Sequence, residues 1–159
     1  MRRESKKIKV GNLYIGGDSP ISVQSMLNVP SFDIENSVKQ ALKLQEAGCD
    51  IVRVAVPDIQ SVRLIDALKN NVEMPIVADI HFDYRIAIEC ANAGVDKIRI
   101  NPGNIGDDQK VKVVADICNQ KNIPIRIGVN SGSVEKSILN KHGGPTAGAL
   151  VDSALYHAS

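Results

Sequence analysis

Short apolar runs rich in β-branched residues alternate along this chain with longer segments whose apolar residues recur three to four positions apart. The first pattern is typical of buried strands and the second of helices that pack on one side. Their alternation predicts βαβ units around a parallel sheet. Five strands are predicted, at residues 21–25, 51–55, 76–80, 97–101 and 125–129. Before them, residues 8–15 followed by Gly16-Gly17-Asp18 predict a small β-hairpin.

Helix boundaries follow from capping residues. Asp33 precedes the first helical segment and Gly48 follows it, while Asp58 and Asp83 are placed to cap the next two helices and Gly94 ends the second of these. The apolar face of the first helix is formed by Ile34, Val38, Ala41 and Leu42. The inner face of the fourth is formed by Val111, Val114, Ala115 and Cys118.

A last helix is predicted at residues 146–156, directly after Pro145, which suits a helix start. Leu150, Ala154 and Leu155 are expected on its packed side.

An internal repeat identifies the architecture. Residues 47–54 (AGCDIVRV) match residues 93–100 (AGVDKIRI), and residues 74–79 echo residues 123–128. The repeating unit of roughly 25 residues is close to the roughly 31 expected when eight units form a barrel. The sequence therefore predicts the first five βα units of a (β/α)8 TIM-type barrel, a partial substrate-binding domain over residues 1–159. Because five strands cannot close such a barrel, we expect an incomplete chain that is marginally stable or self-associating.

Composition narrows the function classes. The formal net charge of +1 leaves no broad basic surface for nucleic acid. No apolar run approaches the roughly 20 residues that span a bilayer, and the N-terminus lacks a signal-peptide pattern, so we expect a cytoplasmic protein without membrane contact. The three cysteines show no Cys-x-x-Cys spacing and are expected to be buried apolar residues rather than metal ligands.

Polar residues gather where the predicted strands end. The C-terminal ends of the strands form the working face of a parallel barrel, and alternate residues of each strand point into its interior. The candidate binding residues selected in this way are Arg53, Asp79, His81, Arg99, Asn101, Arg126 and Asn130.

Three arginines in a barrel interior indicate an anionic ligand. Guanidinium groups inside a barrel are costly unless an anion neutralises them, and their bidentate contacts suit phosphate or diphosphate. In the alternative interpretation, each arginine pairs with a carboxylate such as Asp50, Asp79 or Asp96 and only joins strands. His81 could likewise be a structural histidine, and residues 101–104 (NPGN) could be simple turn residues. Gly16-Gly17 and Gly143-Gly144 match no phosphate-binding fingerprint and are interpreted as turns.

Several blocks carry a specific resemblance: residues 23–26 (VQSM), 52–57 (VRVAVP), 77–85 (VADIHFDYR), 99–106 (RINPGNIG) and 126–133 (RIGVNSGS). Together they resemble the 4-hydroxy-3-methylbut-2-enyl-diphosphate synthase family over almost the whole chain. Residues 27–30 (LNVP) depart from the threonine-rich segment usual in that family.

The resemblance implies an oxidoreductase of the non-mevalonate isoprenoid pathway. Its barrel binds 2-C-methyl-D-erythritol 2,4-cyclodiphosphate, and two-electron reductive ring opening with loss of water gives 4-hydroxy-3-methylbut-2-enyl diphosphate. A separate C-terminal domain, expected to be absent here, holds a [4Fe-4S] cluster, flavodoxin or ferredoxin supplies the electrons, and the full-length protein is a homodimer.

By position, the resemblance makes Arg53, His81, Arg99 and Arg126 diphosphate ligands. Asp79, Asn101 and Asn130 then line the substrate site. It places no catalytic residue and no cluster ligand in this chain, which alone is expected to be inactive.

Two other functions stay open. One is a non-catalytic half-barrel that binds a phosphorylated small molecule. The other is a different barrel enzyme, such as a pterin-binding synthase or a sugar-phosphate lyase. A lyase of that kind needs a lysine at the working face, whereas Lys97 begins its predicted strand and is expected at the opposite end.

Overall fold

Two sheets organise the computed structural model, which describes residues 3–158. Strands β1 (Ile8–Val10) and β2 (Leu13–Ile15) form the predicted antiparallel hairpin. The second sheet is parallel, and its strands lie side by side in chain order: β3 (Gln24–Met26), β4 (Ile51–Ala55), β5 (Ile76–Ile80), β6 (Lys97–Ile100) and β7 (Ile125–Ile127). This order confirms the five predicted parallel strands.

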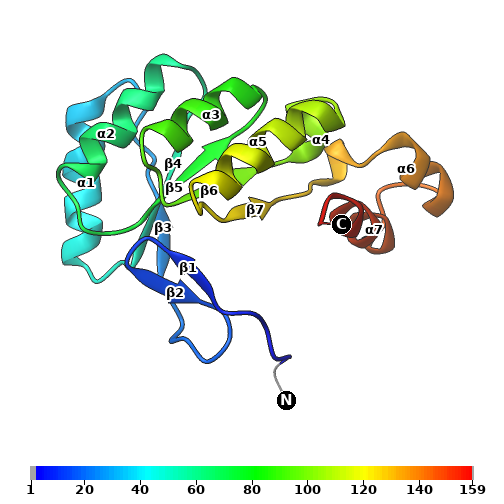
Figure 1. Cartoon of the computed structure of the whole chain (residues 1–159), viewed down its shortest axis with the longest axis horizontal. Helices are drawn as coiled ribbons and strands as arrows, with labels where there is room; N and C mark the ends of the chain where they lie inside the picture. The colour runs from blue at the N-terminus through cyan, green and yellow to red at the C-terminus, as the bar shows by residue number, and fades with distance from the viewer. Residues whose placement is uncertain (1–2, 159) are drawn as a thin grey trace.

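Helices cover one face of this sheet, and the hairpin lies below it in the view of Figure 1. The helices that follow the strands are α1 (Ile34–Glu46), α2 (Arg63–Lys69), α3 (Tyr84–Asn92) and α5 (Asp108–Gln120). The remaining helical segments are η1 (Gln60–Val62), α4 (Pro102–Ile105), η2 (Ser131–Ser133), α6 (Lys136–His142) and α7 (Ala147–Ala158). None of the helices among residues 3–158 has the length and apolar character needed to cross a membrane.

The core lies between the sheet and these helices. Alternate residues of β4, β5 and β6 point toward the helices and are at most 2% exposed: Val52, Val54, Ile76, Ala78, Ile80, Ile98 and Ile100. Burying one such Val or Ile side chain contributes about 1.5–3 kcal/mol. Since successive strand residues point to opposite faces, the residues between them face the barrel interior. The helix layer thus fixes which side chains line the site.

The predicted caps are largely confirmed. Carboxylates of Asp33 and Asp83 accept hydrogen bonds from the first-turn amides of α1 and α3, and Gly48 and Gly94 follow these helices with positive φ. Asp58 differs, because its carboxylate accepts from Ser61 N at 2.8 Å and so caps the 3-10 turn η1 before α2.

Some boundaries predicted from the pattern are wrong. Strand pairing in β3 begins at Gln24 rather than at residue 21, and Ile21 is 75% exposed. Strands β6 and β7 end one and two residues early, because Asn101 starts helix α4 and the chain leaves the sheet after Ile127. Helices α4 and α6 were not predicted. Both are short, and Gly143 ends α6 with φ of 69°.

The packed faces of two helices also differ from the prediction. In α5, Val111, Val114 and Cys118 pack on the core, whereas Ala115 is exposed. In α7, Ala149 and Ser153 are the fully buried residues, whereas Leu155 is 64% exposed. Leu150 and Ala154, also predicted on the packed side, are half-buried, so only Leu155 is misplaced.

The cysteines behave as predicted at two of three positions. Cys90 and Cys118 are buried in the core, and burial raises the pKa of their thiols to about 12 and about 11. Cys49 is only half-buried, with its Sγ 3.1 Å from the carbonyl oxygen of Ile51.

Candidate functional site

The candidate site lies on the sheet face opposite the helices. In the parallel register Asp79 pairs with Arg99, and Arg99 pairs with Arg126, so these side chains stand at one level on three neighbouring strands. Arg53 pairs with Val77, two residues before Asp79 on β5. The structure therefore brings all three arginines and Asp79 to the same face.

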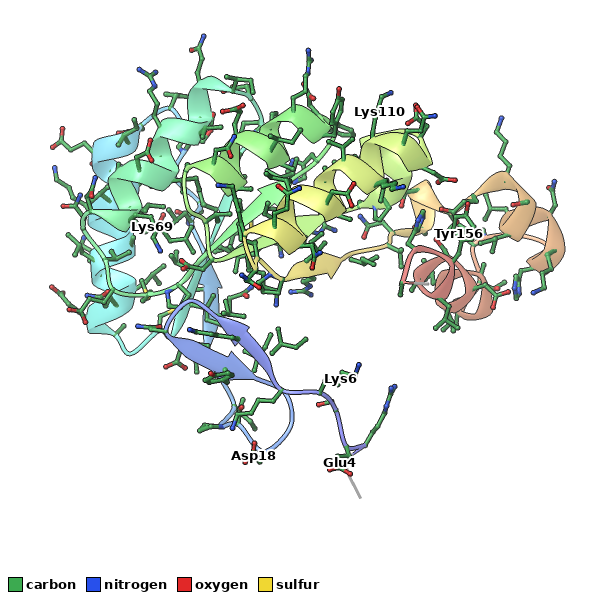
Figure 2. The ribbon with its side chains drawn as sticks, in the orientation of Figure 1. Glu4, Lys6, Asp18, Lys69, Lys110 and Tyr156 are labelled. Atoms are coloured by element: carbon green, nitrogen blue, oxygen red, sulfur yellow. The ribbon has the colours of Figure 1, made fainter. Side chains whose placement is uncertain are left out.

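This level is close to the C-terminal ends of the strands. In Figure 2, Lys110 near the start of α5 and Tyr156 on α7 lie toward the end where β7 finishes, and Lys69 at the end of α2 lies on the far side. The site is thus at the end of the sheet where a parallel barrel carries its working face.

Asp79 is the centre of an ion cluster. Its Oδ1 accepts from Arg99 Nη1 at 3.1 Å, and its Oδ2 accepts from Arg53 Nε at 3.1 Å and from Arg53 Nη2. The Asp79 side chain is 1% exposed and that of Arg99 is 13% exposed. Burial alone would raise the pKa of the Asp79 carboxyl, but the hydrogen bonds and charges of Arg53 and Arg99 lower it. Asp79 is therefore ionised and holds both guanidinium groups.

The carboxylate-pairing interpretation is thus correct for Arg53 and Arg99, with Asp79 as the shared partner. The other two carboxylates are used elsewhere. Asp50 accepts from Val23 N at 2.7 Å, and Asp96 pairs with Lys69 and accepts from Ile76 N.

One carboxylate does not balance the cations around it. Within residues 3–158, no carboxylate lies within ion-pair distance of Arg126, which is exposed. Lys97, two residues before Arg99 on the same face, is also without such a partner in the described chain. Burial and the nearby Arg126 charge lower the pKa of Lys97. Four cations against one carboxylate leave a net positive face that favours a multiply charged anion.

Lys97 was considered from the sequence only as a lyase lysine, and not as a further cation on the arginine face. It does begin β6, as predicted, but its side chain is half-buried on the face that carries the arginines. Its position two residues before Arg99 was the available signal.

His81 extends the cluster toward solvent. It directly follows β5, and its Nε2 lies 3.4 Å from Asp79 Oδ2, a contact that is an ion pair only when the ring is protonated. With a side chain that is 41% exposed, His81 can reach a ligand at the strand ends. Its neighbour Phe82 is 72% exposed and lies edge-on to the imidazole.

Asn101 and Asn130 are arranged differently from the arginines. Asn101 is 1% exposed, and its Nδ2 donates to Ser133 Oγ at 2.7 Å. Asn130 is exposed and immediately precedes the turn η2 that contains Ser133. Asn130 is thus exposed to solvent, whereas Asn101 is covered by the chain.

Gly128 shapes the site without a side chain. A Cβ atom at this position would lie 2.6 Å from both Nε and Nη2 of Arg99. The guanidinium thus extends over the backbone just after β7, which only glycine leaves open. This residue was quoted in the sequence pattern but not recognised as a determinant of the site.

The segment that departs from the family pattern is held to α1. Leu27 is 6% exposed, its N–H donates to Arg53 O at 2.9 Å, and Gln40 bonds both the backbone and the side chain of Asn28. The segment of residues 27–30 therefore begins directly beside β4, the strand that carries Arg53.

No metal-binding group is formed by the described part of the chain: residues 3–158 contain no cluster of three or more His, Cys, Asp or Glu side chains that could hold a metal ion. The buried thiols of Cys90 and Cys118, with their raised pKa values, are poor thiolate donors. An iron-sulfur cluster does not fit these residues.

Comparison with known proteins shows which family the chain resembles. Residues 5–159 match the model of the GcpE TIM-barrel domain. The chain is 56% identical over 158 residues to a 4-hydroxy-3-methylbut-2-en-1-yl diphosphate synthase (flavodoxin) of Ruminiclostridium cellulolyticum, and 56% identical over 156 residues to that of Clostridium perfringens. These matches cover 99% and 98% of this chain, which spans about 45% of the length of either relative.

Solved structures with a similar fold are dihydropteroate synthases. That of Xanthomonas albilineans in complex with 7,8-dihydropteroate superimposes with a TM-score of 0.64 at 19% identity, over 86% of this chain and 54% of the other. That of Burkholderia cenocepacia gives 0.59 at 16% identity, over 92% and 59%. At such identities the similarity shows the barrel-type fold alone.

Proposed function

Because the chain belongs to the GcpE TIM-barrel domain family, we propose that it is the diphosphate-binding part of a 4-hydroxy-3-methylbut-2-enyl-diphosphate synthase. In the longer protein the reaction is the two-electron reductive opening and dehydration of 2-C-methyl-D-erythritol 2,4-cyclodiphosphate in isoprenoid biosynthesis. The observation that carries the proposal is the excess of cations around Asp79. Arg53 and Arg99 share that carboxylate, while Arg126 has no carboxylate partner within residues 3–158.

The proposed role of each arginine follows from its free donors. A guanidinium has five N–H groups. Arg99 uses one of them on Asp79 and Arg53 uses two, so both keep donors for phosphate oxygens. Arg126 contributes its whole charge. Together they neutralise a diphosphate whose charge the ring opening increases.

Asp79 acts in this proposal as a positioning residue rather than as a ligand. A buried carboxylate facing an anionic substrate would be repelled, but here it faces the guanidinium groups and fixes their orientation. His81, next to the cluster, is proposed to donate a hydrogen bond to a phosphate oxygen. Asn130 is proposed to contact the polar edge of the same substrate.

The electrons require a further group. The family resemblance assigns them to a [4Fe-4S] cluster reduced by flavodoxin or ferredoxin, in a homodimeric cytoplasmic enzyme, and the relatives' name includes flavodoxin. We propose that the cluster belongs to the part of these longer proteins that this chain does not match. The chain by itself is then expected to bind substrate without turnover, which is also what the half-barrel binding hypothesis predicts.

The test is calorimetric titration of the 159-residue chain with the cyclic diphosphate. Wild type is expected to bind saturably, and Arg99→Ala is expected to bind roughly tenfold or more weakly, because hydrogen bonds to charged groups contribute about 1.5–3 kcal/mol. Arg63→Ala is the matched control, since Arg63 is an exposed arginine at the start of α2 whose Nε donates only to Gln60 O. Equal affinity of the two variants would contradict the site.

A further inference from the structure

The Ser133 hydroxyl joins two loops at the end of the sheet. It accepts from Asn101 Nδ2 at 2.7 Å and from Asn130 N at 3.3 Å, and it donates to Asn130 O at 3.1 Å. A hydroxyl has one donor and two acceptor positions, so all three are occupied. Ser133 therefore has no bond left for a ligand, and its contacts are internal to the chain.

Asn101 is buried, although its position in the sequence predicts that it lines the site. The open sheet leaves the arginine face accessible, yet the Asn101 side chain is 1% exposed. Its Oδ1 is buried near Gly103 at the start of α4 and has no hydrogen-bond partner in the described part of the chain. Among residues 3–158 the Asn101 side-chain amide thus has one hydrogen bond, to Ser133, which makes that bond the route by which Asn101 can influence a ligand.

The backbone is closely packed at the same junction. A Cβ atom on Gly103 would lie 2.5 Å from the carbonyl oxygen of Ser133. The turn η2 therefore rests directly on α4, and the segment that carries Asn130 is fixed against the end of β6 by both a hydrogen bond and a contact. Arg126 lies four residues before Asn130 in the same segment.

We propose that Ser133 is a positioning residue of the anion site. Its hydroxyl, oriented by the buried Asn101, holds the segment after β7 and so fixes Asn130 at the end of the strand that carries Arg126. This inference rests on the proposed diphosphate site. It changes the role of Asn101 from a ligand of the substrate to a support for the loop.

The test compares Ser133→Ala with Ser131→Ala, a matched control in the same turn whose exposed hydroxyl makes no hydrogen bond in the described chain. The probe is inorganic diphosphate, titrated calorimetrically into the 159-residue chain. Removing the hydroxyl leaves the Asn101 side-chain amide and the Asn130 N–H without their acceptor, so affinity is expected to fall roughly fivefold to tenfold in Ser133→Ala and by less than about twofold in Ser131→Ala. Ser133→Thr keeps the hydroxyl and is expected to restore wild-type affinity.

Hydrogen exchange, followed by NMR without ligand, separates this proposal from the anion site itself. The backbone amide of Asn130 and the side-chain amide of Asn101 are expected to be protected in wild type and Ser133→Thr, and to exchange faster in Ser133→Ala. Unchanged exchange, or equal affinity of Ser133→Ala and Ser131→Ala, would overturn the positioning role. A folded wild type with protected amides that binds no diphosphate would instead overturn the proposed function, and the ligand-positioning role with it.

Discussion

Asp79 Oδ1 accepts a hydrogen bond from Arg99 Nη1 at 3.1 Å, across two neighbouring parallel strands whose register places these residues opposite each other. The same carboxylate binds Arg53 through its other oxygen. A single buried acid thus sets the direction of two of the three arginines.

Replacing Asp79 by Asn is expected to destabilise the chain by about 3 kcal/mol, because breaking a buried ion pair leaves uncompensated charge. Urea unfolding at pH 7 measures the change. Asp116→Asn on the exposed side of α5 is the control and is expected to stay within about 0.5 kcal/mol of wild type. Equal stability of the two variants would mean that the cluster does not hold the strands together.

The same pair predicts a pH dependence. The Asp79 pKa is lowered in the folded chain, so ionised Asp79 stabilises the fold fully above its unfolded pKa of about 3.9, and this contribution is lost as the pH falls through the folded value. The stability difference between wild type and Asp79→Asn is therefore expected to be constant near neutral pH and to shrink below about pH 4. A difference that grows on acidification would contradict the assignment.

Gly128→Ala is expected to weaken diphosphate binding roughly tenfold, because the new methyl group would occupy the place of the Arg99 guanidinium and disturb its charge-assisted bonds. Gly132→Ala is a close control, since a Cβ atom there meets nothing within 4 Å. Calorimetric titration of both variants with inorganic diphosphate measures the two affinities. Equal affinity of Gly128→Ala and Gly132→Ala would show that the Arg99 guanidinium can bind diphosphate even with a side chain at position 128.

Thiol reactivity should separate the cysteines. In the folded chain iodoacetamide at pH 8 is expected to modify the half-buried Cys49 well before Cys90 and Cys118, whose thiols are buried and whose pKa values are raised to about 12 and about 11. In denaturant all three should react at similar rates. Mass spectrometry of peptides measures the order, and early labelling of Cys90 would show that the core opens readily.

The strands and the helix caps could be predicted from the sequence because they depend on local pattern. β4 and β5 match residues 51–55 and 76–80, Asp33 caps α1 before β4, and Asp83 caps α3 after β5. The start of β3 was predicted too early, at residue 21. The apolar residues before Gln24 have strand character, but pairing with β4 begins only at Gln24.

The partners within the site could not be predicted in the same way. Whether Arg53 meets Asp50 or Asp79 depends on the register between strands, which no local pattern specifies. The burial of Asn101 depends on the turn η2, more than thirty residues later. Gly128 and Ser133 carry little local signal, because their effects arise from what lies against them in space.

Phosphorus NMR of the cyclic diphosphate tests whether Arg53, Arg99 and Arg126 form a diphosphate site on this chain. Titration with wild-type chain is expected to shift or broaden both phosphorus resonances saturably, and Arg126→Ala is expected to reduce the effect because Arg126 is the one of these three arginines that no carboxylate pairs with among residues 3–158. Unchanged resonances in the presence of the demonstrably folded chain would contradict the account.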